Sequence, residues 1–145
     1  MTVRVVPAAE PPTGDPVGQW SLRPHASSAG LARRLVAQAM GGAGDQVLRR
    51  AALVTSELVG NSVRHARGGL SLDVQRVGGG WMVTVSDDSS APPQLRESGP
   101  SAENGRGMLI VARVSEQLGW ARTPTGKVVW ARFLDADPEA GQPAP

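Results

Sequence analysis

Apolar residues recur with a helical period in two stretches of the first half of the chain. The first stretch predicts a helix that Ser27 or Ser28 caps and that ends at about Met40. The second predicts a longer helix that Asp45 caps and that ends at about Ala66. The positions that carry these two stripes are Leu31, Leu35, Val36 and Ala39, and then Val47, Ala51, Val54, Leu58 and Ser62.

Alternating or β-branched runs predict strands elsewhere. Gln19–Arg23 is a short run that Pro24 ends. Three consecutive glycines separate Leu70–Val77 from Trp81–Ser86, which predicts a hairpin. Trp120–Arg122 and Val128–Leu134 predict a second hairpin near the end of the chain.

The remaining segment divides into a loop and a third helix. Asp87–Asn104 shows no apolar period, and loops of about this length are usually functional or mobile. Gly105–Leu118 returns to helical spacing. Helices and strands therefore do not alternate strictly. This order predicts an α+β fold, a two-layer sandwich with a mixed sheet that carries helices on one face.

Composition sets the expected domain boundaries. Residues 1–18 and 135–145 are rich in Pro, Ala and Gly, which predicts a flexible N-terminal arm and a disordered C-terminal tail. One compact domain is expected over residues 19–134, in a chain of 145 residues.

Several function classes are excluded by composition. The absence of Cys excludes disulfides, Cys-ligated metals and Cys nucleophiles. No apolar run approaches the roughly 18 residues of a membrane span, and the first residues lack the pattern of a signal peptide, so a cytoplasmic protein is expected. The pI near 10.4 reflects missing Tyr and Cys rather than a surface that binds nucleic acid, because the net charge is only +2. Direct binding to nucleic acid is not expected.

Three motifs have the residue types of a chemical site. Glu57, Asn61 and His65 lie at i, i+4 and i+8, along one edge of the long predicted helix. A β-branched strand runs into the acidic pair Asp87–Asp88. Glycines open the third helix in the segment 104–108, where backbone N–H groups could approach an anion. Each motif alone has a plainer interpretation: a solvated helix flank, a turn-initiating Asp, and a permissive loop junction.

Taken in order, the motifs resemble the nucleotide-binding boxes of the GHKL ATPase superfamily, which includes histidine-kinase-like ATPases. The resemblance is strongest to the anti-sigma-factor serine kinases and the related stand-alone regulators of actinomycetes. It covers about residues 19–134. The matching strings are Ser56-Glu57-Leu58-Val59-Gly60-Asn61-Ser62-Val63-Arg64-His65-Ala66, Val85-Ser86-Asp87-Asp88-Ser89-Ser90-Ala91-Pro92-Pro93, Gly105-Arg106-Gly107-Met108-Leu109-Ile110-Val111 and Gly126-Lys127-Val128-Val129-Trp130.

The resemblance implies a Bergerat-type sandwich that binds ATP and Mg²⁺. It implies that Asn61 is a ligand of the metal and that Glu57 is the general base. Arg64 and His65 would lie near the phosphates or the ribose, and Asp87 would accept the exocyclic N–H of adenine. The remaining cofactor-binding residues implied by these boxes are Ser89, Asn104, Gly105, Arg106, Gly107 and Met108.

The sequence departs from the family pattern in the first box. Ser89 and Ser90 stand where glycines usually follow the Asp. The only lysine, Lys127, does not lie in a P-loop motif. The triphosphate would therefore be held by Asn61 with Mg²⁺, by Arg64 and by backbone N–H groups at Gly105–Gly107.

Two functions follow from the resemblance. One is an anti-sigma factor with serine/threonine kinase activity, whose partners are a sigma factor and the antagonist that it phosphorylates. The other is an ATP-binding interaction module without catalysis, whose nucleotide state controls partner binding. A histidine-kinase fragment is disfavoured because no helix pair with a phospho-acceptor His precedes the domain. Kinases of this branch are often dimers, so a homodimer is one expectation.

Overall fold

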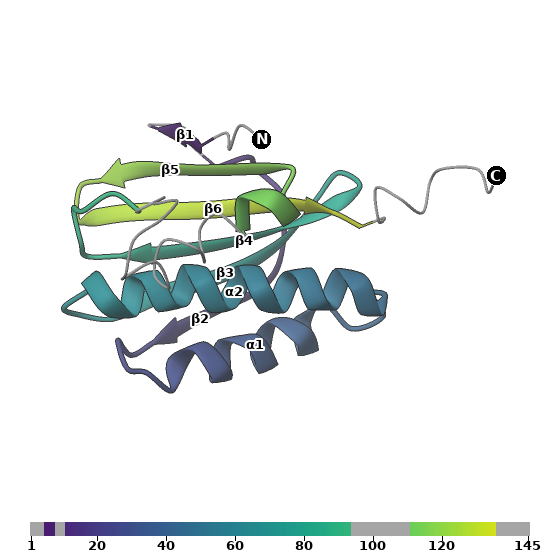
Figure 1. The fold of residues 1–145 in the computed structure, drawn as a ribbon, viewed down its shortest axis with the longest axis horizontal. Helices are drawn as coiled ribbons and strands as arrows, with labels where there is room; N and C mark the ends of the chain where they lie inside the picture. The colour runs from purple at the N-terminus through teal and green to yellow at the C-terminus, as the bar shows by residue number, and fades with distance from the viewer. Residues whose placement is uncertain (1–4, 8–10, 94–110, 136–145) are drawn as a thin grey trace.

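The fold has two layers, one β-sheet and two helices that pack on the same face of it (Figure 1). A computed structural model describes residues 5–7, 11–93 and 111–135 of the chain. Within these ranges the predicted α+β sandwich is confirmed.

The sheet has six strands in the order β1-β5-β6-β4-β3-β2. Each pair of neighbours is antiparallel except β1 and β5, which are parallel, so the sheet is mixed. Both predicted hairpins are present, as β3–β4 and β5–β6. The strand bounds are β1 Val5–Pro7, β2 Asp15–Leu22, β3 Leu70–Val77, β4 Gly80–Asp87, β5 Gln117–Thr123 and β6 Gly126–Leu134.

The helices are α1 (Ser28–Ala39) and α2 (Asp45–His65), close to the predicted bounds. The N-cap position predicted for α1 is confirmed and the one predicted for α2 is wrong, and neither helix has a side-chain cap. Ser27 occupies the N-cap of α1, but its hydroxyl contacts His25 Nδ1 at 2.8 Å instead of capping the helix. Gly44, and not Asp45, is the N-cap of α2. Both helices therefore depend on packing rather than on side-chain caps.

The main core lies between the helices and the sheet. All five positions of the predicted α2 stripe are buried, from Val47 to Ser62. They pack against residues that alternate along the strands, such as Leu72, Val83 and Phe133. Period 3.6 on the helix and period 2 on the strands thus meet at one interface.

The sheet extends further toward the N-terminus than the sequence predicts. Residues 5–7 and 15–18 belong to β1 and β2, although the whole of residues 1–18 was expected to be a flexible arm. Proline and glycine obscure the alternation there, and pairing with β3 and β5 supplies the order that local propensity lacks.

Two predicted boundaries near the C-terminus are also wrong. The third helix does not reach Leu118, because residues 111–114 are helical and Gln117 already belongs to β5. Asp135 is not part of a free tail, because its backbone N–H donates to the Gly79 carbonyl at 2.9 Å. The rest of the predicted tail, residues 136–145, lies outside the described residues.

No helix in the described part of the chain is long and apolar enough to cross a membrane.

Candidate functional site

The site begins where two central strands meet under the second half of α2. β4 ends at Asp87, and the antiparallel register places Lys127 of β6 directly opposite. Residue 126 must be glycine, because a Cβ there would collide with the Asp87 carbonyl oxygen. The close approach of the two strands therefore places one acidic and one basic side chain side by side.

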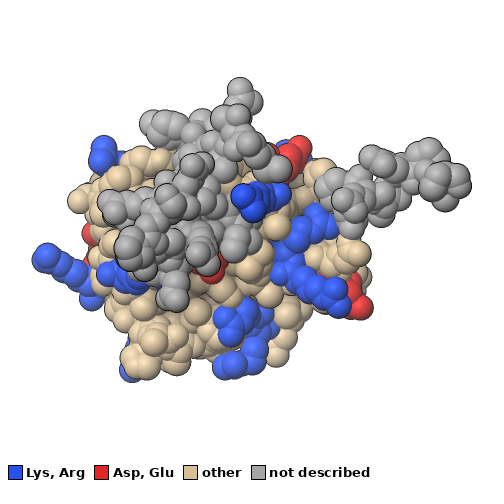
Figure 2. All heavy atoms as spheres, in the orientation of Figure 1, with Lys and Arg blue, Asp and Glu red and all other residues tan. Residues whose placement is uncertain are grey.

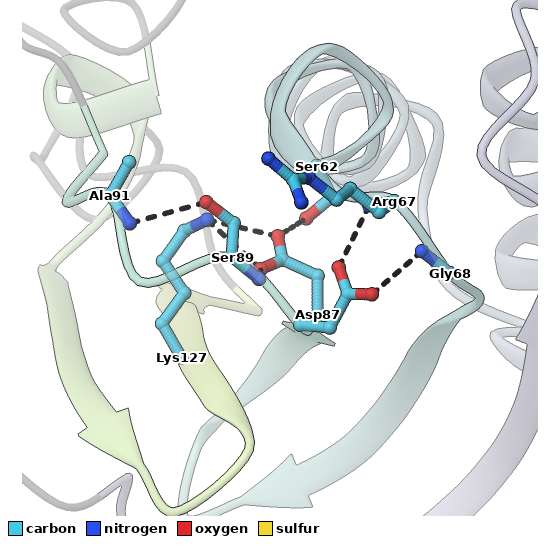
Figure 3. Close-up of polar contacts among 8 residues, drawn as sticks. Ser62, Arg67, Gly68, Asp87, Ser89, Ala91 and Lys127 are labelled. Carbon is cyan, nitrogen blue, oxygen red and sulfur yellow. Dashed lines mark hydrogen bonds and ion pairs between the residues drawn. The ribbon is translucent and has the colours of Figure 1, made fainter.

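The Asp87 carboxylate is held on both oxygens (Figure 3). Lys127 Nζ lies 3.0 Å from Oδ1 and from Oδ2. Ser62 of α2 donates its hydroxyl to Oδ2 at 2.5 Å, and the backbone N–H of Ser89 donates to Oδ1 at 2.9 Å. The carboxylate thus joins α2, β4, β6 and the start of the following loop.

Burial makes this cluster costly to disturb. The side chains of Lys127 and Asp87 are 0% and 1% exposed. A buried charge is tolerated when it has a counter-charge and hydrogen bonds that satisfy its remaining lone pairs. Asp87 has both, because Lys127 supplies the counter-charge and Ser62 and Ser89 supply hydrogen bonds.

Asn61 supplies a second polar group next to this cluster along α2. It is 3% exposed, and its Oδ1 accepts no hydrogen bond within the described ranges. A buried acceptor without a donor costs free energy, which points to a ligand that completes it. An amide oxygen is a ligand type that Mg²⁺ accepts, so the residue fits the predicted metal-binding role.

The other predicted residues of α2 differ in exposure. Glu57 lies one turn before Asn61 and is half-buried, and His65 is half-buried at the last residue of the helix. Arg64 is exposed, and its guanidinium lies back along the helix near Gly60. The structure therefore aligns Glu57 and Asn61 on one edge, whereas it does not bring Arg64 to the Asp87 cluster.

The loop after β4 is fixed to the end of α2. The exposed Asp88 carboxylate accepts the backbone N–H groups of Arg67 at 2.9 Å and of Gly68 at 2.6 Å. These two hydrogen bonds lower the pKa of Asp88 below its ordinary value of 3.8. The half-buried Ser89 accepts the Ala91 N–H on its hydroxyl. Its side chain thus stabilises the first turn of the loop.

The predicted glycine box lies outside the described residues; its members are Asn104, Gly105, Arg106, Gly107 and Met108.

The face of the molecule that carries the helices is rich in basic groups. Figure 2 shows more Arg side chains than Asp and Glu side chains on this face. Exposed arginines of α1, of α2 and of the turn after it are Arg33, Arg34, Arg49, Arg64 and Arg67. A field of this sign attracts anionic ligands such as polyphosphates.

Two site residues escaped the sequence analysis. The sequence predicts Ser62 only as part of the apolar stripe, and it gives Lys127 a place in the closing-strand match without a role in the site. A hydroxyl in an otherwise apolar helix stripe was the available signal for Ser62. For Lys127 the signal was a lone lysine in an apolar strand, Gly126-Lys127-Val128-Val129-Trp130. Its pairing with Asp87 depends on a strand register that the sequence does not show.

Comparison with known proteins agrees with this geometry. The family model described as the histidine kinase-like ATPase domain matches residues 22–133, which include α1, α2 and five of the six strands in whole or in part. No curated protein shows significant similarity to the chain. The family is one of ATPase domains, so membership implies ATP binding, typically with Mg²⁺. The chain belongs to the histidine kinase-like ATPase domain family.

Proposed function

We propose that this protein is an ATP-dependent serine/threonine kinase that acts as an anti-sigma factor. Its substrate is the antagonist protein that releases the sigma factor. The observation that carries the catalytic part is the placement of half-buried Glu57 one turn before Asn61 on α2, where the Asn61 Oδ1 accepts no hydrogen bond from the described residues. The identity of the two partners, and a homodimeric state, rest on the resemblance of the sequence motifs.

The side chains have distinct roles in this proposal. Asn61 would hold Mg²⁺ through its Oδ1, which accepts no hydrogen bond from the described residues, and the metal would supply positive charge opposite the phosphates. Asp87 accepts the exocyclic N–H of adenine. Glu57 accepts the proton of the substrate hydroxyl while that oxygen bonds to the γ-phosphorus and the bond from the γ-phosphorus to ADP breaks.

A second candidate is a nucleotide-binding module that performs no phosphoryl transfer. The observation that favours it is the Asp87 carboxylate, whose acceptor sites are all engaged by Lys127, Ser62 and Ser89. A nucleotide that displaces one of these contacts would act on α2, on β6 and on the start of the loop after β4 together, which suits a site that transmits nucleotide binding to a partner surface. Phosphoryl transfer needs accurate positioning that this function does not.

Glu57→Gln separates the two candidates, because the amide keeps the side-chain volume and cannot accept the proton. The kinase predicts transfer from labelled ATP to a co-encoded antagonist that falls by about 10²-fold or more, whereas the affinity for ATP changes less than about threefold. Glu116→Gln is the matched control, since the exposed Glu116 pairs with Arg132 far from Asp87 along the strands.

Full transfer by Glu57→Gln would contradict the role of Glu57 as the base. Absence of transfer by the wild type, together with ATP-dependent binding of the partner, would establish the second candidate instead.

A further inference from the structure

Lys127 is a buried cation that the proposed function leaves without a role. It is the only lysine of the chain and is 0% exposed. A lysine whose stem crossed the core to reach solvent would expose its ammonium group. Here the ammonium ends inside the molecule beside the residue to which adenine recognition was assigned.

The donors of the ammonium are not all used. An ammonium group carries three N–H donors and no acceptor. In the described ranges, Lys127 Nζ contacts only the two oxygens of Asp87, each at 3.0 Å. Among the described residues, at least one donor therefore has no acceptor, and a buried donor without an acceptor is unfavourable.

Unlike the donors of Lys127, the acceptor positions of the Asp87 carboxylate are all occupied. A carboxylate offers about four lone-pair positions, and here they meet two contacts from Lys127, one from Ser62 and one from Ser89. An incoming N–H group can bind only if one present donor gives way. Lys127 can give way most readily, because its ammonium holds both oxygens and keeps one after the exchange.

We propose that Lys127 determines nucleobase specificity by donating to N1 of adenine while Asp87 accepts from the N6 amine. One Lys127 N–H leaves Asp87 and turns to N1, and the oxygen that it leaves accepts the N6 hydrogen. The Lys127 ammonium then keeps two hydrogen bonds, one to Asp87 and one to N1, and the Asp87 carboxylate keeps four, with the N6 hydrogen in place of one Lys127 contact. This inference rests on the proposed binding of ATP at Asp87.

The pair also rejects guanine in the same position. Guanine would direct its O6 acceptor at the Asp87 carboxylate and its N1–H donor at the Lys127 ammonium. One contact would place an acceptor against an acceptor and the other a donor against a donor. A buried polar group left without a partner is strongly disfavoured.

Calorimetric titration of the wild-type protein with nucleotide analogues tests the proposal without a mutation. 1-Deaza-ATP lacks the N1 acceptor, and 7-deaza-ATP is the control that lacks a ring nitrogen elsewhere. We expect 1-deaza-ATP to bind at least about tenfold more weakly than ATP, since hydrogen bonds to charged groups are among the stronger ones. The affinity for 7-deaza-ATP should stay within about threefold.

The outcomes separate this inference from the proposed function. If ATP and 1-deaza-ATP bind equally well, Lys127 does not read N1, although ATP binding stands. Equal weakening by both analogues would also overturn the assignment to N1. If no nucleotide binds, the proposed function fails and this inference fails with it.

The single lysine allows a direct spectroscopic measurement. Selective ¹⁵N-lysine labelling yields one side-chain Nζ resonance, that of Lys127. We expect Mg-ATP to shift this resonance and 1-deaza-ATP to leave it close to its nucleotide-free position. An Nζ resonance that stays fixed while ATP binds would contradict the exchange of hydrogen bonds. Lys127→Met adds a third readout, because it should bind ATP and 1-deaza-ATP with the same affinity.

Discussion

The two ends of the central strands each carry an Asp paired with a cation, in opposite environments. At one end, here called the site end, Asp87 and Lys127 are 1% and 0% exposed. At the other, the far end, Asp135 pairs with Arg76 at 2.8 Å, and these side chains are 40% and 37% exposed. The far pair is further supported by the Trp81 ring, over which the Arg76 guanidinium lies at 4.4 Å.

Burial, rather than pairing itself, decides what each pair does. Exposed ion pairs contribute about 0–1 kcal/mol, because water and salt screen them. A buried pair gains little in net stability, yet removal of one partner leaves an uncompensated charge in the interior. The far pair therefore connects two strand ends at the surface. In the proposed function, the site pair keeps a charged group buried at the position where the nucleotide binds.

Removing the buried cation should have the largest effect. Lys127→Met keeps most of the side-chain volume and leaves the Asp87 carboxylate without its counter-charge. We expect the free energy of unfolding to fall by about 3–5 kcal/mol, measured by urea denaturation.

The double variant Lys127→Met/Asp87→Asn is the control for this prediction. It removes both charges, so most of the lost stability should return. A single variant that loses less than about 1 kcal/mol would show that the site pair behaves like the far pair.

The sequence predicts the helices and strands of the molecule better than it predicts which charged side chains pair. Apolar periodicity predicts α1, α2 and both hairpins, because the pattern of buried positions on a helix or strand lies within the sequence of that element. The pairing of Asp87 with Lys127 joins positions forty residues apart and exists only in the register of β4 and β6. No local pattern contains that register.

The same difference between order within one element and order from distant pairing applies to the other predictions. The edge formed by Glu57 and Asn61 follows from helical spacing within one element, and both residues lie where the spacing predicts. The order in residues 5–7 and 15–18 comes from pairing with distant strands, so their composition was misleading. The contacts of Asp135 with Arg76 and Trp81 also join distant positions.

Asn61→Ala tests whether the second buried polar group of the site end serves a ligand. Loss of the free Oδ1 should weaken Mg-ATP binding by at least about tenfold, roughly 1.4 kcal/mol, in calorimetric titrations. Stability should change little, because no hydrogen bond to this oxygen is lost. Binding measured with EDTA in place of Mg²⁺ should show a smaller difference between the variant and the wild type.

Thr84→Val is the matched control for Asn61→Ala. Thr84 also carries a buried oxygen that has no hydrogen-bond partner among the described residues, but it lies on β4 among residues of the helix-free face. Its replacement should leave the affinity for Mg-ATP unchanged. Equal losses in the two variants would mean that the effect at Asn61 is general destabilisation.

Acid should weaken both ends through carboxylates of lowered pKa. The Arg67 and Gly68 N–H groups lower the pKa of Asp88, and Arg76 and Trp81 lower that of Asp135. A lowered folded-state pKa contributes stability above the ordinary value of 3.8 and loses it as the pH falls through the folded value. Asp88→Asn should therefore flatten the decline of stability below about pH 4.

The pKa of Asp73 is shifted in the opposite direction to those of Asp88 and Asp135. Burial raises its pKa, so its unfavourable contribution appears as the pH rises from 3.8 through the folded value. Asp73→Asn should raise stability at neutral pH and steepen the acid decline.

An acid decline that Asp88→Asn leaves unchanged would show that the two backbone hydrogen bonds of Asp88 do not control it.

The far pair should give the smallest effect of all. Asp135→Asn removes the negative charge while keeping an oxygen that can accept the Trp81 Nε1–H, now 3.1 Å from Asp135 Oδ1. Because the pair is about two-fifths exposed, the loss of stability should be below about 1 kcal/mol and should shrink further in about 1 M salt. The affinity for Mg-ATP should not change, because Asp135 follows the end of β6 and Lys127 lies at its beginning. A loss as large as that of Lys127→Met would mean that charge pairing, and not burial, sets the cost at both ends of the sheet.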